Sequence, residues 1–250
     1  MSHALHTIRY EDLFAGHELS KPFKLVLPQN KRIIVLSDCH LNSRFDEAVF
    51  KKFKKIIQKA DCIVINGDFW ADSAGSFDAF MKSEWKKLFP LLKAKNTYYV
   101  FGNHDMPILS DERIQQFSTW AGFRLKIKAG NILLHIEHGH LLSGNFVRKI
   151  LTMYQKHPKL LKYSTLPFGI GEDVVRYFAA KTNSGVLKKL NTEFKVRRHA
   201  VSNKNEYFLM GHTHAPEFDS EARYVNSGLT HNGHFDYIEV YENKIVIKSL

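Results

Sequence analysis

Gly102-Asn103-His104-Asp105 directly follows the apolar run from Thr97 to Phe101. A short β-branched and aromatic run that ends in glycine is typical of a buried strand whose carboxyl end opens into a loop. The loop then offers an amide oxygen, an imidazole and a carboxylate within three residues, which suits a metal ligand beside a proton donor. A capped turn would explain this motif equally well on its own.

Four further apolar runs end in residues of the same kind. The runs at 32–36, 61–65, 132–136 and 207–210 lead into Ser37-Asp38-Cys39-His40, Asn66-Gly67-Asp68, Glu137-His138-Gly139-His140 and Gly211-His212-Thr213-His214. Taken singly, the aspartates could be ordinary caps at strand ends and His138 a hydrogen-bonded core histidine. Five strand ends that all carry oxygen and imidazole groups favour one shared site.

Length and composition predict a globular protein with a single domain over residues 1–250. The chain is 44% apolar, which is enough to bury one substantial core. It contains no run of about 18 uncharged apolar residues, and its first residues lack the basic and then apolar pattern of a secretory signal. We therefore expect a cytoplasmic protein in which Cys39 and Cys62 are reduced packing residues.

Hydrophobic periodicity predicts a mixed α/β order of elements. Helices are expected over 46–60, 77–92 and 112–121, where apolar residues recur at helical spacing. Strands are expected at 23–27, 33–36, 61–65, 97–101, 124–128, 131–136, 207–210, 223–225, 235–241 and 244–248. Helical crossovers predominate in the first half and hairpins in the second. The lysine run within 46–60 is interpreted as a solvated helix face.

Most of the net charge of +11 lies in residues 141–206, where 13 Lys and Arg stand against 4 Asp and Glu. This stretch separates the fourth and fifth motifs, so we expect a basic helical insertion over the site, with helices near 146–155, 172–181 and 184–194. Apolar faces beside cationic ones fit an amphiphilic anion or an anionic membrane surface. A cap that packs on the core with a solvated basic face fits as well.

The ligand types indicate phosphoryl chemistry. Asp, His and Asn side chains suit Mn²⁺, Fe²⁺, Zn²⁺ or Mg²⁺, and a carboxylate can bridge two such ions. Two cations about 4 Å apart can hold a phosphate and generate a hydroxide nucleophile for an in-line displacement. The expected partner is thus a phosphate-containing anion, which agrees with the basic charge of the chain.

The five motifs, in this order, resemble those of the calcineurin-like metallophosphoesterases, and the resemblance covers most of residues 31–228. It implies an α/β fold with a two-sheet β-sandwich flanked by helices in α-β-β-α layers, and two divalent metal ions, with Mn²⁺ as the first choice. By that resemblance one ion is held by Asp38, His40 and His214, and the second by Asn103, His138 and His212. Asp68 would bridge the two ions. His104 would contact the phosphate and act as general acid.

The chain departs from the family at the residue that orients this histidine. Many members carry an acidic residue three positions after the bridging aspartate, where this chain has Ala71, and the next residue is Asp72. Either Asp72 or Asp105 could orient His104, and the sequence leaves the choice open. His140 is held as an accessory residue. His135 falls on the opposite strand face by period two, which favours a structural role.

A helical insertion at this point resembles the UDP-2,3-diacylglucosamine pyrophosphatase branch, as do the segments Ser37-Asp38-Cys39-His40-Leu41 and Gly67-Asp68-Phe69-Trp70. That resemblance implies a lipid-linked nucleotide substrate and a peripheral position at the inner face of a membrane. The branch commonly has Arg where this chain has His104. A nucleotide or nucleic-acid phosphodiesterase is the first alternative, because basic side chains also bind the phosphate backbone of a nucleic acid. A non-catalytic scaffold with the same fold is the second, although it should have lost ligands.

Overall fold

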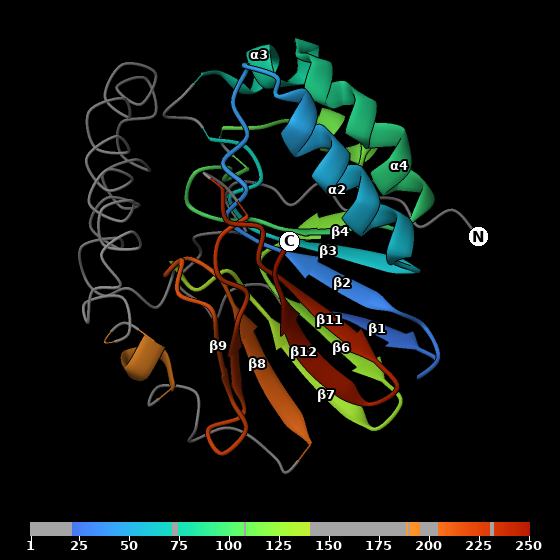
Figure 1. Ribbon diagram of the computed structural model, residues 1–250, viewed down its shortest axis with the longest axis vertical. Coiled ribbons are helices and arrows are strands. Elements are labelled where there is room, and N and C mark those ends of the chain that lie inside the picture. The colour runs from blue at the N-terminus through green and yellow to red at the C-terminus, as the bar shows by residue number, and fades with distance from the viewer. Residues whose placement is uncertain are drawn as a thin grey trace.

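The structure is a computed structural model that describes residues 22–71, 75–107, 109–140, 189, 191–195, 205–230 and 233–250. Within these residues two six-stranded sheets pack together, and helices cover the outer face of one of them (Figure 1). The predicted class, an α/β fold built on a two-sheet sandwich flanked by helices, is confirmed. A single domain with an insertion at 141–206 stays a prediction, because most of that stretch lies outside the described residues.

The first sheet has the strand order β12-β11-β2-β3-β4-β5. Its strands are β2 (Ile33–Leu36), β3 (Cys62–Asn66), β4 (Tyr98–Val100), β5 (Trp120–Gly122), β11 (Tyr237–Tyr241) and β12 (Lys244–Lys248). The four strands β2 to β5 are parallel, while β11 runs antiparallel to β2 and to β12. Parallel strands bring their carboxyl ends to one edge, so the loops after β2, β3 and β4 are neighbours.

The second sheet has the strand order β1-β6-β7-β8-β10-β9. Its strands are β1 (Phe23–Leu27), β6 (Leu125–Ala129), β7 (Ile132–Ile136), β8 (Glu206–Met210), β9 (Glu217–Asp219) and β10 (Tyr224–Asn226). β6 and β7 form the predicted antiparallel hairpin, whereas β7 and β8 pair in parallel. The carboxyl ends of β7 and β8 therefore also lie side by side, although residues 137–205 separate them in the chain.

The core is divided between two layers by the alternation of strand residues. Ile34, Ile63 and Tyr99 point into a cluster beneath the helices, while Ile33, Val64 and Val100 point into a cluster shared with the second sheet. The first sheet is buried on both faces, which explains why its parallel strands are continuous apolar runs.

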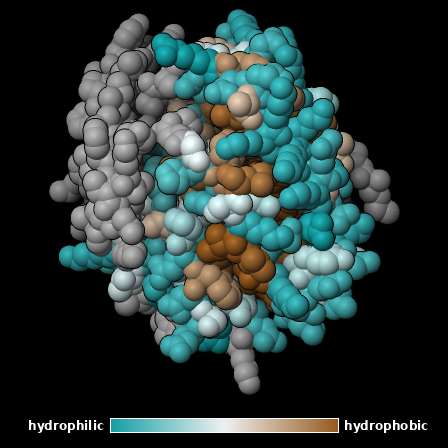
Figure 2. Space-filling view, in the orientation of Figure 1, coloured by the Kyte–Doolittle hydropathy of each residue, from teal (hydrophilic) through white to brown (hydrophobic). Residues whose placement is uncertain are grey.

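Helix α2 (Glu47–Lys59) shows how the outer helical layer forms. Asp46 caps its first turn by accepting from the backbone N–H groups of Ala48 and Val49. The helix buries Phe53, Ile56 and Ile57, each worth about 1.5 to 3 kcal/mol on transfer from water. Most of its lysines are exposed, which confirms the solvated face, and Figure 2 shows hydrophilic residues over the outside of this helical layer.

Two predicted helices differ from the structure. The segment 77–92 is divided into α3 (Phe77–Lys82), the 3-10 helix η2 (Glu84–Leu88) and α4 (Phe89–Ala94). The break lies at Ser83, whose hydroxyl donates to the Phe80 carbonyl at 2.6 Å and caps the next turn. The predicted helix 112–121 is wrong beyond the 3-10 helix η3 (Glu112–Gln116), because the residues after it pair with β4 as strand β5.

The predicted helices at 146–155 and 172–181 lie outside the described residues, as does most of that at 184–194. Residue 189 and residues 191–195 are helical. Phe194 of this segment packs with Phe208, Met210 and Tyr224 on the face of the second sheet that points away from the first. None of the described helices combines the length and the apolar character that crossing a membrane requires.

Candidate metal centre

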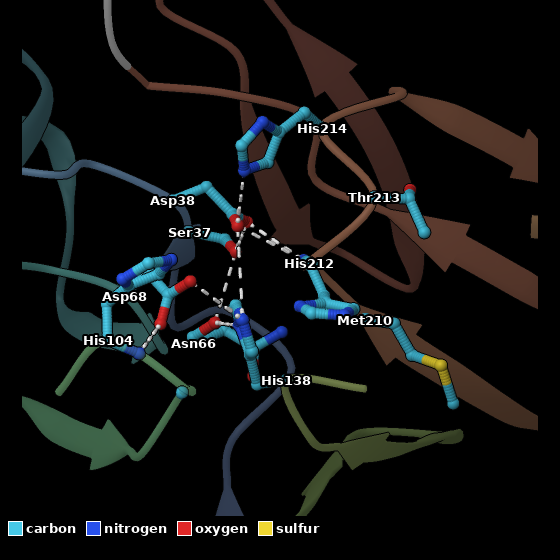
Figure 3. A network of polar contacts seen from close by, with 12 residues as sticks. Ser37, Asp38, Asn66, Asp68, His104, His138, Met210, His212, Thr213 and His214 are labelled. Carbon is cyan, nitrogen blue, oxygen red and sulfur yellow. Dashed lines mark hydrogen bonds and ion pairs between the residues drawn. The ribbon is translucent and has the colours of Figure 1, made fainter. Parts of the chain in front are cut away.

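The polar residues after β2, β3, β4, β7 and β8 meet at one edge of the sandwich, and most of them are buried (Figure 3). All seven predicted metal ligands lie in the described residues. Six of them fall into two compact groups of ligand atoms, each within 4.8 Å of one another: Asp38, His40 and His214 in the first group, and Asp68, His138 and His212 in the second. The structure thus brings together residues up to 176 positions apart in the chain.

Asp68 links the two groups. Besides its place with His138 and His212, it forms a third group with His40 and His104, again within 4.8 Å. One carboxylate therefore lies within reach of ligands from both sides, which is the arrangement that a bridging ligand requires. The seventh predicted ligand, Asn103, follows β4 and is half-buried.

Several buried ligand atoms face one another without hydrogen bonds. Nε2 of His138 lies 3.2 Å from Oδ2 of Asp68, and neither atom has a hydrogen-bond partner among the described residues. The same holds for Oδ1 of Asn103. Buried polar atoms are normally paired, so convergent atoms of this kind fit a cation that binds between them. The donor set is therefore suited to divalent metal ions.

His138 is held in the tautomer that a ligand needs. Its Nδ1 donates to the backbone carbonyl of Asn66 at 2.8 Å, which leaves Nε2 directed at the carboxylates (Figure 3). The Asn66 side chain in turn donates to the Glu137 carbonyl at 3.3 Å, and so connects the end of β3 to the residue after β7. Asn66 had no role predicted from the sequence, although its place directly before Gly67-Asp68 was a usable signal.

Ser37 is a second residue whose role the sequence analysis missed. Its hydroxyl donates to the carboxylate of Asp38, and its oxygen lies 3.1 Å from the carbonyl oxygen of Asn66. The other support of Asp38 comes from the second sheet, where the backbone N–H of His212 donates to both carboxylate oxygens at 3.1 and 3.2 Å. Asp38 therefore ties the loop after β2 to the loop after β8.

Five residues of the site adopt the left-handed backbone conformation, which is unusual outside glycine. Their φ angles are 53° for Asp38, 44° for His40, 54° for Asp68, 67° for His212 and 58° for His214. Each costs about 1 to 2 kcal/mol relative to an ordinary conformation. Such conformations persist only where surrounding contacts hold them, and they concentrate at functional sites.

Glycines in the motifs make room for ligands from neighbouring loops. A Cβ at Gly102 would overlap the carboxylate of Asp68, and one at Gly211 would overlap Ser37 and Asp38. The glycines of Gly-Asn-His-Asp and Gly-His-Thr-His are therefore required by the close approach of the loops.

The electrostatics of the centre favour positive charge among the carboxylates. Burial alone would raise the pKa of Asp68, but His138 and His104 hold that pKa well below its ordinary value. Burial would lower the pKa of His138, yet Asp68 and Asp38 raise it to about 9. The lowered pKa favours the ionised form of Asp68, and the surrounding charges favour a cation beside it, whether a proton on His138 or a metal ion.

Asp105 and Asp72 were predicted as alternative partners of His104. The Asp105 carboxylate accepts from the Tyr99 hydroxyl at 2.5 Å and from the backbone N–H groups of Gly102 and Phe69 at 2.6 and 2.8 Å. This geometry favours a role in shaping the 102–105 loop. Burial and the nearby Asp68 raise the pKa of Asp105 to about 6. Asp72 lies outside the described residues.

Of the remaining candidates, His104 and His140 lie beside the ligand groups, whereas His135 and Cys39 are not members of them. His104 is buried, its ring centroid lies 5.1 Å from that of His40, and its backbone N–H donates to Asp68 at 2.9 Å. His140 is buried 5.5 Å from His138, centroid to centroid, beside the second group. His135 lies 3.3 Å from Glu206 and is not a member of any of these groups. Cys39 belongs to the hydrophobic cluster beneath the helices.

Comparison with known proteins matches residues 31–216 to a family model described as calcineurin-like phosphoesterase. A search of curated proteins finds no match. Among solved structures, the chain is similar to a phosphoesterase from E. coli named Yfce, with 15% identity over 88% of this chain and 98% of the other, and a TM-score of 0.44. A dimetal phosphatase from Danio rerio shares 12% identity over 88% and 96%, with a TM-score of 0.46. A putative diadenosine tetraphosphatase shares 14% identity over 92% and 98%, also with a TM-score of 0.46.

Proposed function

The chain belongs to the calcineurin-like phosphoesterase family, and from that premise we propose that it hydrolyses a phosphodiester or pyrophosphate bond at a centre of two divalent metal ions. The observation that carries the proposal is the pair of ligand groups with Asp68 between them. A scaffold without activity would have no need to keep both groups, or to hold five of their residues in a strained backbone conformation.

The first ion is assigned to Asp38, His40 and His214, and the second to Asn103, His138 and His212, with Asp68 as the bridging ligand. The orphaned oxygen of Asn103 and the directed Nε2 of His138 support the second assignment. Mn²⁺ is the first choice for this mixed oxygen and nitrogen set, with Fe²⁺, Zn²⁺ and Mg²⁺ as alternatives. When bound, such ions neutralise phosphate charge and activate water as a nucleophile.

His104 is assigned the role of general acid toward the leaving group. Its position is coupled to the bridging carboxylate, because its backbone N–H donates to Asp68 at 2.9 Å. The Asp105 carboxylate shapes the same loop by accepting from Gly102 N–H. A ring nitrogen of His104 lies within 4.8 Å of ligand atoms of Asp68 and His40, which supports a role in protonating a leaving oxygen beside the ions.

For the substrate we propose a lipid-linked nucleotide such as UDP-2,3-diacylglucosamine, reached from an anionic membrane surface through residues 141–206. The support is the charge of that stretch and its place between the two motifs that end β7 and β8. Phe69 and Trp70, which carry part of the resemblance to that branch, are buried in the cluster beneath the helices and pack there. Their contribution is structural.

The experiment that tests the function is product analysis with metal-free protein reconstituted with Mn²⁺. The substrates are detergent-dispersed UDP-2,3-diacylglucosamine and a simple aryl phosphodiester, and the variant is His104→Ala with His135→Gln as the histidine control outside the metal groups. UMP release that requires His104 supports the lipid-linked nucleotide. Hydrolysis of the aryl diester alone would indicate that the substrate is a nucleotide or a nucleic acid instead. Absence of hydrolysis by protein that binds two ions would favour the scaffold.

A further inference from the structure

Residues 191–195 pack against the second sheet next to the loop that carries His212 and His214. This helical turn, drawn in orange beside β9 in Figure 1, is held on the second sheet by the buried ring of Phe194. That ring lies nearly parallel to the ring of His212, with 6.5 Å between centroids. Lys195 forms ion pairs with Glu217 and Asp219 on β9. The carboxyl end of the turn is therefore fixed against the sheet that supplies His138, His212 and His214.

Asn191 is fully buried and uses both ends of its amide. Its Nδ2 donates to the Ala215 carbonyl at 3.1 Å and to Glu217 at 2.8 Å. Its Oδ1 accepts from the hydroxyls of Thr213 at 2.7 Å and Tyr224 at 2.9 Å. Only a side chain with donors on one side and an acceptor on the other satisfies all four groups.

Thr213 stands between the two histidines of the Gly-His-Thr-His motif. Figure 3 shows its side chain directed away from Asp38. Its hydroxyl donates to Oδ1 of Asn191 at 2.7 Å. Asn226 completes the support by donating to Thr213 Oγ1 at 3.0 Å and to the Gly211 carbonyl at 2.9 Å. The loop is thus held on one side by Asp38 and on the other by Asn191 and Asn226.

These hydrogen bonds support a strained part of the backbone. His212 and His214 have φ angles of 67° and 58°, and a strained backbone of this kind needs contacts that over-determine it. The hydrogen bond from Thr213 to Asn191 fixes the residue between them. The hydrogen bonds of the Asn191 amide go to Ala215, Glu217, Thr213 and Tyr224 rather than to His212 or His214, so its effect on these histidines passes through the backbone of the loop.

We propose that Asn191 is a positioning residue for the metal centre, and that it connects the turn at residues 191–195 to His212 and His214 through Thr213. The inference rests on the proposed function, since it takes these histidines as metal ligands. Outer residues that orient ligands change metal affinity by about 10- to 100-fold when they are replaced. Loss of the Asn191 amide should therefore weaken metal binding while every ligand side chain remains.

The test uses Asn191→Asp, which keeps the oxygen that accepts from Thr213 and turns the donor face toward Glu217 into a repulsive one. The matched control is Asn243→Asp, the same change at an exposed turn remote from the site. Mn²⁺ is titrated into metal-free protein by calorimetry, and Co²⁺ absorption reports the ligand geometry. We expect about tenfold weaker binding and an altered Co²⁺ spectrum for Asn191→Asp, with both unchanged for Asn243→Asp. Adding Glu217→Gln, which supplies a donor to the new carboxylate, should recover part of the affinity.

A second pair of variants decides the question if Asn191→Asp does not fold. Thr213→Val removes the hydroxyl at nearly constant volume, and Thr213→Ser restores it. We expect weaker binding for the first and near wild-type affinity for the second. Folded variants of either residue with unchanged affinity and spectrum would overturn the inference even if the wild-type protein is an active phosphoesterase. Conversely, Asn191-dependent metal binding by a protein that hydrolyses no phosphoester would leave the inference standing and remove the proposed function.

Discussion

The two sheets contribute different chemistry to the same edge of the molecule. The first sheet supplies both aspartates of the candidate centre, from the ends of β2 and β3, while the second sheet supplies His138, His212 and His214 from the ends of β7 and β8. The closest charged contacts cross between the sheets, with His214 Nε2 3.1 Å from Asp38 and His138 Nε2 3.2 Å from Asp68. The group of His40, Asp68 and His104 comes entirely from the first sheet, but each of the two groups assigned to an ion combines residues of both sheets. The two assigned groups therefore form only when the sandwich is closed.

The sheets also differ in how their loops are supported. The loops after β2 and β3 are followed directly by helices α2 and α3 of the same layer. The loop after β8 depends instead on contacts from residues 191–195, which belong to the stretch between β7 and β8. We infer that changes in residues 191–195 act first on His212 and His214, and that changes in the helical layer act first on the residues after β2 and β3.

The largest expected effect comes from removing the charge that both groups share. Asp68→Asn keeps the volume of the side chain but loses the anion that lies within reach of ligands from both sheets. We expect at least about a thousandfold loss of phosphoesterase turnover. Metal titration should show fewer than two bound ions. Turnover within tenfold of wild type, with both ions bound, would show that Asp68 does not bridge the two ions.

A methyl group added at a glycine of the site tests whether the loops must approach each other closely to hold the ligands. In Gly102→Ala the new Cβ would overlap Asp68, and in Gly211→Ala it would overlap Ser37 and Asp38. We expect each variant to lose about 3 kcal/mol of unfolding free energy and most of its metal affinity, because a carboxylate of the first sheet must move. The control is Gly233→Ala, where φ is +88° and nothing lies within 4 Å. Chemical denaturation should show only about 1 kcal/mol of strain there.

If the centre closes the sandwich, metal ions should stabilise the whole fold. At a free Mn²⁺ concentration of about ten times the dissociation constant, one site adds about 1.4 kcal/mol to the unfolding free energy. We expect a matching rise in the thermal midpoint for wild type and a smaller one for Asp68→Asn. Equal shifts in the two proteins would place the stabilising ion elsewhere. The comparison requires chelator-treated protein as its baseline.

The residues that sequence reasoning placed well are those fixed by local rules. Continuous apolar runs identified β2, β3, β7 and β8, and Asp46 marked the start of α2. Since the loops after parallel strands meet at one edge, the predicted ligands were recoverable from strand ends alone, and six of the seven fall into the two groups. Their roles as ligands stay a prediction.

The features that sequence reasoning missed depend on distant partners. Strand β5 is fixed by pairing with β4, and β1 and β2, adjacent in the chain, pair with β6 and β3 in different sheets. Ser37 and Asn66 support ligands through contacts with other loops. Asn191 supports the loop after β8 by accepting a hydrogen bond from Thr213. No local period or cap encodes such contacts, so only the closed sandwich reveals them.

The smallest expected effect lies at the opposite end of the first sheet. Asp61 accepts from the backbone N–H of Arg32 at 2.9 Å and lies 3.4 Å from Lys31, between the starts of β2 and β3. The Arg32 hydrogen bond, with help from Lys31, lowers the pKa of Asp61. A carboxyl whose pKa is lowered by folding stabilises the fold above its unfolded pKa of about 4 and loses that contribution as the pH falls through the folded value.

Asp61→Asn should therefore cost less than about 1 kcal/mol near neutral pH, because the side chain is partly exposed and screened by water. The difference from wild type should shrink as the pH of a denaturant titration is lowered from about 6 toward 3.5. Metal affinity and turnover should not change, because Asp61 lies at the amino ends of the strands whose carboxyl ends hold the ligands. A loss of metal affinity in Asp61→Asn would show that the two ends of the first sheet are coupled. The amino ends of its strands would then contribute to metal binding as well as to stability.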